Sequence, residues 1–165
     1  MAGEGASVHG RLVSRSPAET REIGRLLGQR AEAGDVLALS GPLGAGKTIL
    51  AKGVAAGLGV PGVVNSPTFV LMNEHHGRLP LFHVDVYRLS DPRDALDAGL
   101  LDESNARGIS VIEWADQIER ELPADRLDLE LEPRDGDERA ISWRARGPRH
   151  LRLAQALSAL TTRAA

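Results

Sequence analysis

One run of the chain has the residue types and spacing to bind phosphate: Gly41-Pro42-Leu43-Gly44-Ala45-Gly46-Lys47-Thr48, which matches G-x-x-x-x-G-K-[ST] at each fixed position. Such a loop points backbone N–H groups inward and forms an anion cradle. The positive end of a following helix strengthens it. We expect Lys47 to reach the β- and γ-phosphates of a nucleoside triphosphate and the Thr48 hydroxyl to bind Mg²⁺. Expected nucleotide contacts are Gly41, Leu43, Gly44, Ala45, Gly46, Lys47, Thr48 and Ile49.

The segments flanking this loop fit the same interpretation. Val36–Leu39 is a short continuous apolar run, typical of a strand buried on both faces. A helix is expected from about Lys47 to Leu58. The order strand, loop, helix is the context that a phosphate-binding loop requires, and it disfavours a chance glycine-rich turn. Pro42 removes one backbone donor, but early in the loop, where chain reversal matters more.

Two carboxylates are candidates for the metal and the attacking water. Glu113 closes the apolar run Ile109–Ile112, and strand ends in α/β sheets are where sites form. Asp85 lies inside a second strand-like segment and, with Lys47, is a candidate catalytic residue. The alternatives are a solvated Glu113 at a strand exit, and an Asp85 that pairs structurally with Arg88 or His83.

Other polar and aromatic residues leave two interpretations open. Thr68, in Ser66-Pro67-Thr68, could sense the γ-phosphate in a switch or belong to an ordinary turn. Trp114 follows Glu113 and is a core residue or a contact to nucleotide or partner. A lone strand histidine such as His83 is more often packed than catalytic. Asp116 is a weaker acidic candidate.

Composition bounds the rest. The chain has 165 residues, enough for one domain, with residues 1–6 expected to be a flexible tail. A net charge of -3 offers no large basic surface for DNA or RNA. The absence of cysteine excludes disulfides. There is no signal-peptide core or run of about 20 apolar residues. We expect a cytoplasmic protein that binds neither membrane nor DNA.

The remaining patterns predict a three-layer α/β domain with some antiparallel strands. Ser16, Pro17 and Glu19 form a helix start with a capping box, and Gly34 is expected to end that helix. Val8–Val13 is expected to be an edge strand. Further strands are expected at Phe69–Asn73, Leu79–Val86, Ile109–Glu113, Arg126–Glu132 and Ala140–Ala145, and helices at Asp91–Ala98 and His150–Arg163.

Four motifs occur in a fixed order on this short chain: the phosphate loop, Ser66-Pro67-Thr68-Phe69, His83-x-Asp85-x-Tyr87-Arg88-Leu89, and Glu113-Trp114. The combination resembles the TsaE (YjeE) family, small bacterial ATPases of tRNA threonylcarbamoyladenosine biosynthesis, over roughly residues 16–146. The resemblance implies a P-loop NTPase fold with a mixed parallel and antiparallel sheet. It also implies an ATP/ADP cycle with Mg²⁺ that supports the TsaB–TsaD pair, with tRNA met only indirectly through that complex.

Site roles follow from the same resemblance. Thr48 and Glu113 would hold Mg²⁺, Asp85 would be essential for hydrolysis, and Ser66–Phe69, with Thr68, would be a nucleotide-sensitive switch. Trp114 matches the tryptophan beside the family's acid. Arg139 matches a family position that contacts the nucleotide. Two departures are Pro42, where the family often has Asp, and Ile49, where it often has Thr; they bear on the rate more than on the function.

Two other functions remain as alternatives. A small-molecule kinase would use the same loop, but it usually carries an arginine-rich lid, and no such insertion stands out. A nucleotide-dependent binding module would not need hydrolysis, and the discriminating residue is Asp85. No dedicated arginine finger is apparent, so hydrolysis by the chain alone is expected to be slow.

Overall fold

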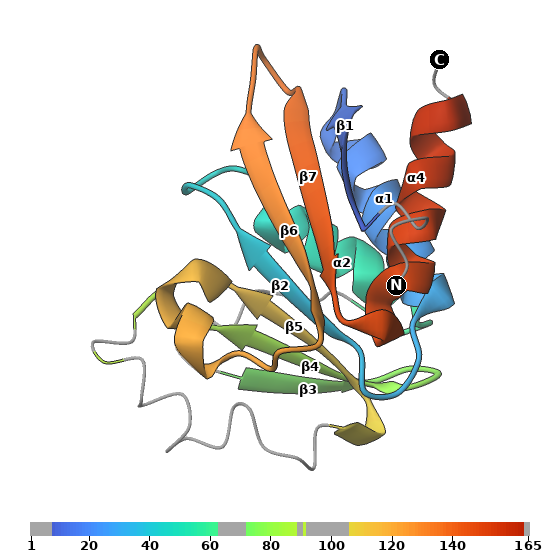
Figure 1. The fold of residues 1–165 in the computed structure, drawn as a ribbon, viewed down its shortest axis with the longest axis vertical. Helices are drawn as coiled ribbons and strands as arrows, with labels where there is room; N and C mark the ends of the chain where they lie inside the picture. The colour runs from blue at the N-terminus through green and yellow to red at the C-terminus, as the bar shows by residue number, and fades with distance from the viewer. Residues whose placement is uncertain (1–7, 63–71, 89–90, 92–105, 164–165) are drawn as a thin grey trace, which may run out of the picture.

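The computed structural model describes residues 8–62, 72–88, 91 and 106–163. Its strands are β1 (His9–Ser14), β2 (Val36–Ser40), β3 (Met72–His76), β4 (Pro80–Asp85), β5 (Ile109–Glu113), β6 (Arg126–Pro133) and β7 (Arg139–Arg146). In these ranges they form one seven-stranded sheet in the order β1-β7-β6-β2-β5-β4-β3 (Figure 1). The adjacent strands β6, β2, β5 and β4 are parallel, and β7, β1 and β3 join antiparallel. The expected mixed α/β sheet is confirmed.

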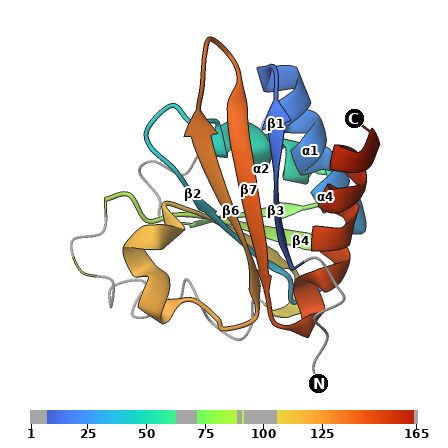
Figure 2. The same ribbon diagram turned by 45° about the horizontal axis from the view of Figure 1, so that its top comes forward.

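In the described part of the chain, three helices cover one face of the sheet: α1 (Pro17–Arg30), α2 (Lys47–Gly57) and α4 (Leu151–Arg163), the last preceded by the short 3₁₀ helix η3 (Pro148–His150). A 3₁₀ helix, η2 (Ala115–Glu121), lies on the opposite face (Figures 1 and 2). The buried apolar side chains of β2 and β5 therefore have cover on both sides, which explains their unbroken hydrophobic runs.

Helix α1 begins as the sequence predicts but ends earlier. Ser16 accepts a hydrogen bond from the backbone N–H of Glu19 at 3.1 Å, as a capping residue does. The helix ends at Arg30 and not at Gly34. The reason is tertiary: the guanidinium of Arg78, in the β3–β4 turn, donates to the carbonyl oxygens of Gly28 at 2.9 Å and Ala31 at 3.0 Å. These carbonyl oxygens would otherwise accept hydrogen bonds from the N–H groups of a further helical turn.

The two helices next to the phosphate loop approach each other very closely. Gly24 and Gly28 of α1 face Gly53 and Gly57 of α2, and a Cβ on Gly28 would lie 2.2 Å from the carbonyl oxygen of Val54. Only glycine allows this approach, because any side chain would collide with backbone that cannot move aside. The contact fixes α2, and with it the loop before α2, against the body of the domain.

Helix η2 has no counterpart among the predicted elements. Ile118 and Leu122 bury their side chains with Ile112 of β5 and Val84 of β4, forming a second apolar cluster. The predicted helix Asp91–Ala98 and the first residues of the predicted strand Phe69–Asn73 lie outside the described residues, apart from Asp91. Among the described helices, none combines the length and apolar character needed to cross a membrane.

Candidate functional site

The phosphate loop connects β2 to α2 and is held against β6. Gly41 has φ +139°, and a Cβ there would lie 2.3 Å from the carbonyl oxygen of Leu131. Gly46, at the helix N-cap, has φ +102° and offers no side chain to cap the helix. Both positions need glycine, one for close approach and one for the left-handed backbone. The first-turn N–H groups of an α-helix have no intrahelical partner, and the motif predicts that those of α2 bind an anion.

Lys47 crosses the mouth of this loop. Its ammonium donates to the carbonyl oxygens of Gly41 at 2.5 Å and Pro42 at 2.9 Å. It also lies 3.7 Å from the centroid of the Trp114 ring, a cation–π distance. Burial lowers the pKa of Lys47, and three carboxylates oppose that shift: Glu113, Asp116 and Asp85. The cation therefore lies among acidic groups in a largely buried position, where a charge interacts strongly with its neighbours.

Glu113 is the centre of a buried polar cluster at the end of β5. The hydroxyl of Thr48 donates to its Oε1 at 2.8 Å, and Nε2 of His83 lies 2.5 Å from its Oε2. The Glu113 and His83 side chains are 2% and 0% exposed. The structure thus joins the two predicted metal ligands, Thr48 and Glu113, directly. It excludes the alternative of a solvated residue at a strand exit.

Asp85 lies beside Glu113 because β4 and β5 are parallel and in register at these residues. Its Oδ1 accepts a hydrogen bond from the backbone N–H of Tyr87 at 2.9 Å. The residue is 8% exposed. The carboxyl ends of parallel strands form one edge of a sheet, and ligands bind along such edges in α/β folds. Asp85 therefore lies at a sheet edge of the kind where ligands bind, and its catalytic role stays a prediction.

Trp114 adopts a strained backbone at the same edge. Its φ of 61° is the one positive value of a non-glycine residue in the described part of the chain. A bulky residue in this region costs about 1–2 kcal/mol, so the surrounding packing must impose it. The ring lies against Tyr87, with centroids 4.6 Å apart, as well as against Lys47. Of the two interpretations, core or site, the position at the site fits these contacts.

Arg139 reaches the loop from the start of β7. Its guanidinium donates to the carbonyl oxygen of Gly44 at 3.3 Å and to that of Glu138 at 2.8 Å. The predicted nucleotide contact is therefore at the phosphate loop, although these bonds are to protein. Ser66 and Thr68, the predicted switch, lie outside the described residues.

The contact between His83 and Glu113 was not predicted from the sequence. The pattern that could have indicated it is the alternation of side chains along β4, which places His83 on the same face as Asp85.

The donor set suits a hard divalent cation bound together with phosphates. Thr48 and Glu113 offer oxygen atoms, the ligands that Mg²⁺ prefers. Within the ranges that the structure describes, no three His, Cys, Asp or Glu residues gather as a metal site. Mg²⁺ is commonly held by one or two protein oxygens plus substrate phosphates, and it does not need a cage of carboxylates. The residues present therefore fit Mg²⁺ carried by a nucleotide.

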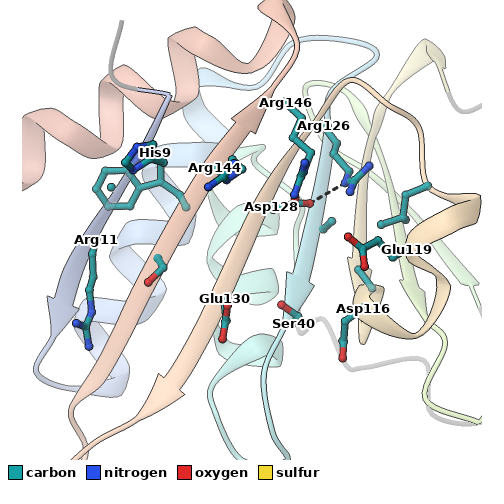
Figure 3. A pocket seen from close by; sticks show the side chains of 16 residues that line it. His9, Arg11, Ser40, Asp116, Glu119, Arg126, Asp128, Glu130, Arg144 and Arg146 are labelled. Atoms are coloured by element: carbon teal, nitrogen blue, oxygen red, sulfur yellow. Dashed lines mark hydrogen bonds and ion pairs between the residues drawn. The ribbon is translucent and has the colours of Figure 1, made fainter. Parts of the chain in front are cut away.

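A separate cavity of about 530 Å³ lies on the sheet face that carries η2 (Figure 3). One end reaches Ser40, immediately before the phosphate loop, and Asp116. At the other end Asp128 accepts from Arg126 at 2.7 Å and Arg146 at 2.5 Å, so these charges pair with each other. None of the residues 41–48 lines this cavity, so it adjoins the phosphate site without being part of it.

Known proteins resemble this chain over most of its length. The model of the family described as "Threonylcarbamoyl adenosine biosynthesis protein TsaE" matches residues 14–141. The tRNA threonylcarbamoyladenosine biosynthesis protein TsaE of Bacillus subtilis is 44% identical over 144 residues, covering 87% of this chain and 90% of that protein. Its counterpart from Treponema pallidum is 43% identical over 121 residues, covering 73% and 90%.

A solved structure extends the likeness to three dimensions. The crystal structure of Bacillus subtilis YdiB superposes with a TM-score of 0.75 at 38% identity, covering 93% of this chain and 96% of that one. The region matched by the family model, residues 14–141, includes the phosphate loop, Asp85 and Glu113. With a family match over most of its length and relatives above 40% identity, this chain belongs to the TsaE family of tRNA threonylcarbamoyladenosine biosynthesis proteins.

Proposed function

We propose that this chain is a Mg²⁺-dependent ATPase whose ATP/ADP cycle supports the TsaB–TsaD complex in the threonylcarbamoyladenosine modification of tRNA. The observation that carries the proposal is the convergence of Lys47, Thr48, Asp85 and Glu113 at one edge of the sheet, in front of the N-terminus of α2. A site that only binds a Mg²⁺–nucleotide complex would need the loop, its lysine and the metal ligands. A hydrolytic site needs in addition a group that acts on the water, and Asp85 at the neighbouring strand end is placed for it.

The nucleotide phosphates would bind the backbone N–H groups of the loop and of the first turn of α2. Thr48 and Glu113 would hold Mg²⁺, which when bound neutralises charge on the β- and γ-phosphate oxygens. Lys47, already directed across the loop, would place its ammonium on the same phosphates. Gly44 and Ala45 would contribute backbone, and Trp114 would restrict the position of Lys47 through the ring contact.

Asp85 would orient the attacking water and accept its proton. The backbone N–H of Tyr87 donates to Oδ1 of this carboxylate at 2.9 Å, which helps to fix the orientation of the group. Such positioned acid–base groups contribute about 10²–10⁴-fold to rates. The sequence shows no dedicated arginine finger, so Arg88 or a residue of the partner complex would supply further charge and raise the rate.

Membership of the TsaE family supports the proposed partner and compartment without testing either. TsaD and TsaB are the proposed partners, tRNA is met through them, and the cytoplasm is the proposed location. A net charge of -3 agrees with an accessory role, because direct tRNA binding calls for a concentrated basic surface.

The test is ADP release by the purified chain with ATP and Mg²⁺, without and then with the TsaB–TsaD complex. We expect slow release that needs no acceptor, is lost in Lys47→Ala, and rises with the complex. Acceptor-dependent release would favour the kinase. Calorimetry that finds no binding of ATP or ADP with Mg²⁺ would end the proposal. A second arm assays modification with Asp85→Asn: modification that continues without hydrolysis would favour a binding module.

A further inference from the structure

His83 is the residue of the site whose contacts have no role in the mechanism described so far. Its side chain is fully buried, with Nε2 2.5 Å from Oε2 of Glu113. The carboxylate oxygen accepts, so Nε2 carries the proton and donates. The other ring nitrogen, Nδ1, is buried and has no hydrogen-bond partner among the described residues. A residue present only to fill the core would not be a half-satisfied imidazole, because an unpaired buried polar atom costs about 1–3 kcal/mol.

We propose that His83 is a positioning residue that fixes the carboxylate of Glu113 in the orientation that a Mg²⁺–nucleotide complex requires. The inference deepens the proposed function and rests on it. In this role the His83 imidazole donates one hydrogen bond, from Nε2 to Oε2 of Glu113.

Glu113 is held from two sides by two different elements. Thr48, in the first turn of α2, donates to Oε1, and His83, in β4, donates to Oε2. A glutamate side chain has three rotatable bonds, and ordering a side chain of this kind costs up to about 2 kcal/mol. With both oxygens engaged, the plane of the carboxylate is set before the cation arrives. Outer partners of metal ligands act in this way, and their loss costs about 10–100-fold in metal affinity or activity.

The strand register explains how one strand serves two purposes. His83 and Asp85 are two residues apart, so their side chains leave β4 on the same face. Asp85 pairs in register with Glu113 itself, and His83 pairs with Val111, two residues before it. The histidine therefore approaches Glu113 from behind, away from the open edge, while Asp85 lies beside it. In the proposed site His83 holds the metal ligand Glu113, and Asp85 acts on the substrate.

The test uses three substitutions that separate hydrogen bonding from packing. The amide nitrogen of glutamine lies near the position of Nε2, that of asparagine lies near Nδ1, and leucine offers no donor. Calorimetry measures the Kd of a non-hydrolysable ATP analogue with Mg²⁺ and with EDTA. The Mg²⁺ ratio, which is the Kd in EDTA divided by the Kd in Mg²⁺, reports how much Mg²⁺ strengthens binding. The thermal unfolding midpoint of each variant is measured without nucleotide.

We expect His83→Leu and His83→Asn to lower the Mg²⁺ ratio about 10-fold or more while the Kd in EDTA stays within about twofold of wild type. His83→Gln should keep most of the ratio. His150→Gln is the control, because it alters another buried histidine–carboxylate pair far along the chain and should change stability without changing the ratio.

Three results would overturn the inference. One is a wild-type Mg²⁺ ratio in folded His83→Leu and His83→Asn. Another is equal loss in the Gln and Asn variants. The third is loss of binding that is as large in EDTA as in Mg²⁺, which would indicate damage to the loop. These outcomes leave the proposed function standing, whereas a wild-type chain that binds no nucleotide in either condition would overturn both.

Discussion

Two buried histidine–carboxylate clusters lie at opposite ends of the central strands, and they differ in how completely their atoms are paired. At the carboxyl ends, His83 contacts Glu113 through one ring nitrogen and leaves the other without a partner among the described residues. At the amino ends, His150 uses both nitrogens: Nε2 accepts from the backbone N–H of Val36 at 2.9 Å, and Nδ1 lies 2.7 Å from Oδ1 of Asp125.

The cluster around His150 extends into a network that ties α4 to the start of the sheet. Asp35, immediately before β2, is fully buried and accepts from Arg152 of α4 at 2.6 and 2.7 Å. It also accepts from the backbone N–H of Glu32 at 2.8 Å. Asp125 leads into β6 in the same way. The partners come from three separate segments, so the network joins them.

The difference separates structure from function. Complete pairing of buried polar groups stabilises one arrangement, and the His150 network has that character. The His83 cluster lies beside a strained Trp114 and a buried Lys47, and such features collect at functional sites. Substitutions at the two ends should therefore act on different quantities: chemistry at one end and the free energy of unfolding at the other.

The largest effect is expected for Asp85→Asn. ATP hydrolysis should fall by about 10³-fold, because the amide cannot accept the proton of the attacking water. The amide oxygen can still accept from Tyr87, so nucleotide Kd and the unfolding midpoint should stay close to wild type. Single-turnover ADP release measures the hydrolysis rate, calorimetry measures the Kd, and thermal unfolding measures the midpoint. A rate within about tenfold of wild type would remove Asp85 from the mechanism.

Asp35→Ala should produce the opposite pattern. It removes the carboxylate that accepts from the guanidinium of Arg152 and from the N–H of Glu32, while Arg152 keeps its bond to Oε2 of Glu32 at 2.5 Å; breaking a buried ion pair costs about 3–5 kcal/mol. Because Arg152 is 29% exposed, water solvates part of its charge, and we expect the free energy of unfolding to fall by about 3 kcal/mol. The unfolding midpoint should drop by roughly 6–12 °C, with hydrolysis unchanged at 20 °C. Asp137→Ala, in an exposed turn, is the matched control; equal losses in both would contradict the comparison.

The pH dependence of stability should also come from the His150 end. Burial lowers the pKa of His150, with Arg152 adding to the shift and Asp125 and Asp35 opposing it. Below pH about 6.5 the unfolded chain takes up a proton that the folded ring does not yet bind. The free energy of unfolding therefore falls with falling pH, by at most about 1.4 kcal/mol per unit from this group.

Urea unfolding of wild type and His150→Gln between pH 7.5 and 5 measures this contribution. The variant should give a flatter profile, because its amide does not titrate. Identical slopes in the two proteins would assign the pH dependence to other groups.

The smallest effect is expected for Arg139→Ala. The bond from Arg139 to the carbonyl oxygen of Gly44 is long, at 3.3 Å, and exposed. Losing it should raise the Kd for ADP about two- to fivefold, the range of one modest hydrogen bond. Arg139→Lys keeps the charge without the planar fork and tests whether charge alone suffices. A loss above about 30-fold would indicate direct phosphate contact by this arginine.

Prediction from sequence succeeded where neighbours in the chain are neighbours in space. Ser16 caps α1 through a residue three positions on, as its pattern indicates. The end of α1 was placed wrongly at Gly34, because the carbonyl oxygens at the helix end accept from Arg78, which lies 47 residues beyond Ala31. Helix η2 was missed, since a 3₁₀ segment has no strong periodic pattern and η2 forms by burying Ile118 and Leu122 in a separate cluster.

The sequence alone determined the phosphate loop, because eight contiguous residues set its backbone through local sterics and donor geometry. It also indicated the buried strands through unbroken apolar runs. Only the tertiary structure decided that Thr48, His83 and Glu113 form one cluster, since these residues lie 30 and 65 positions apart along the chain. Their meeting depends on strand register and on the glycine contact between α1 and α2, which are properties of packing.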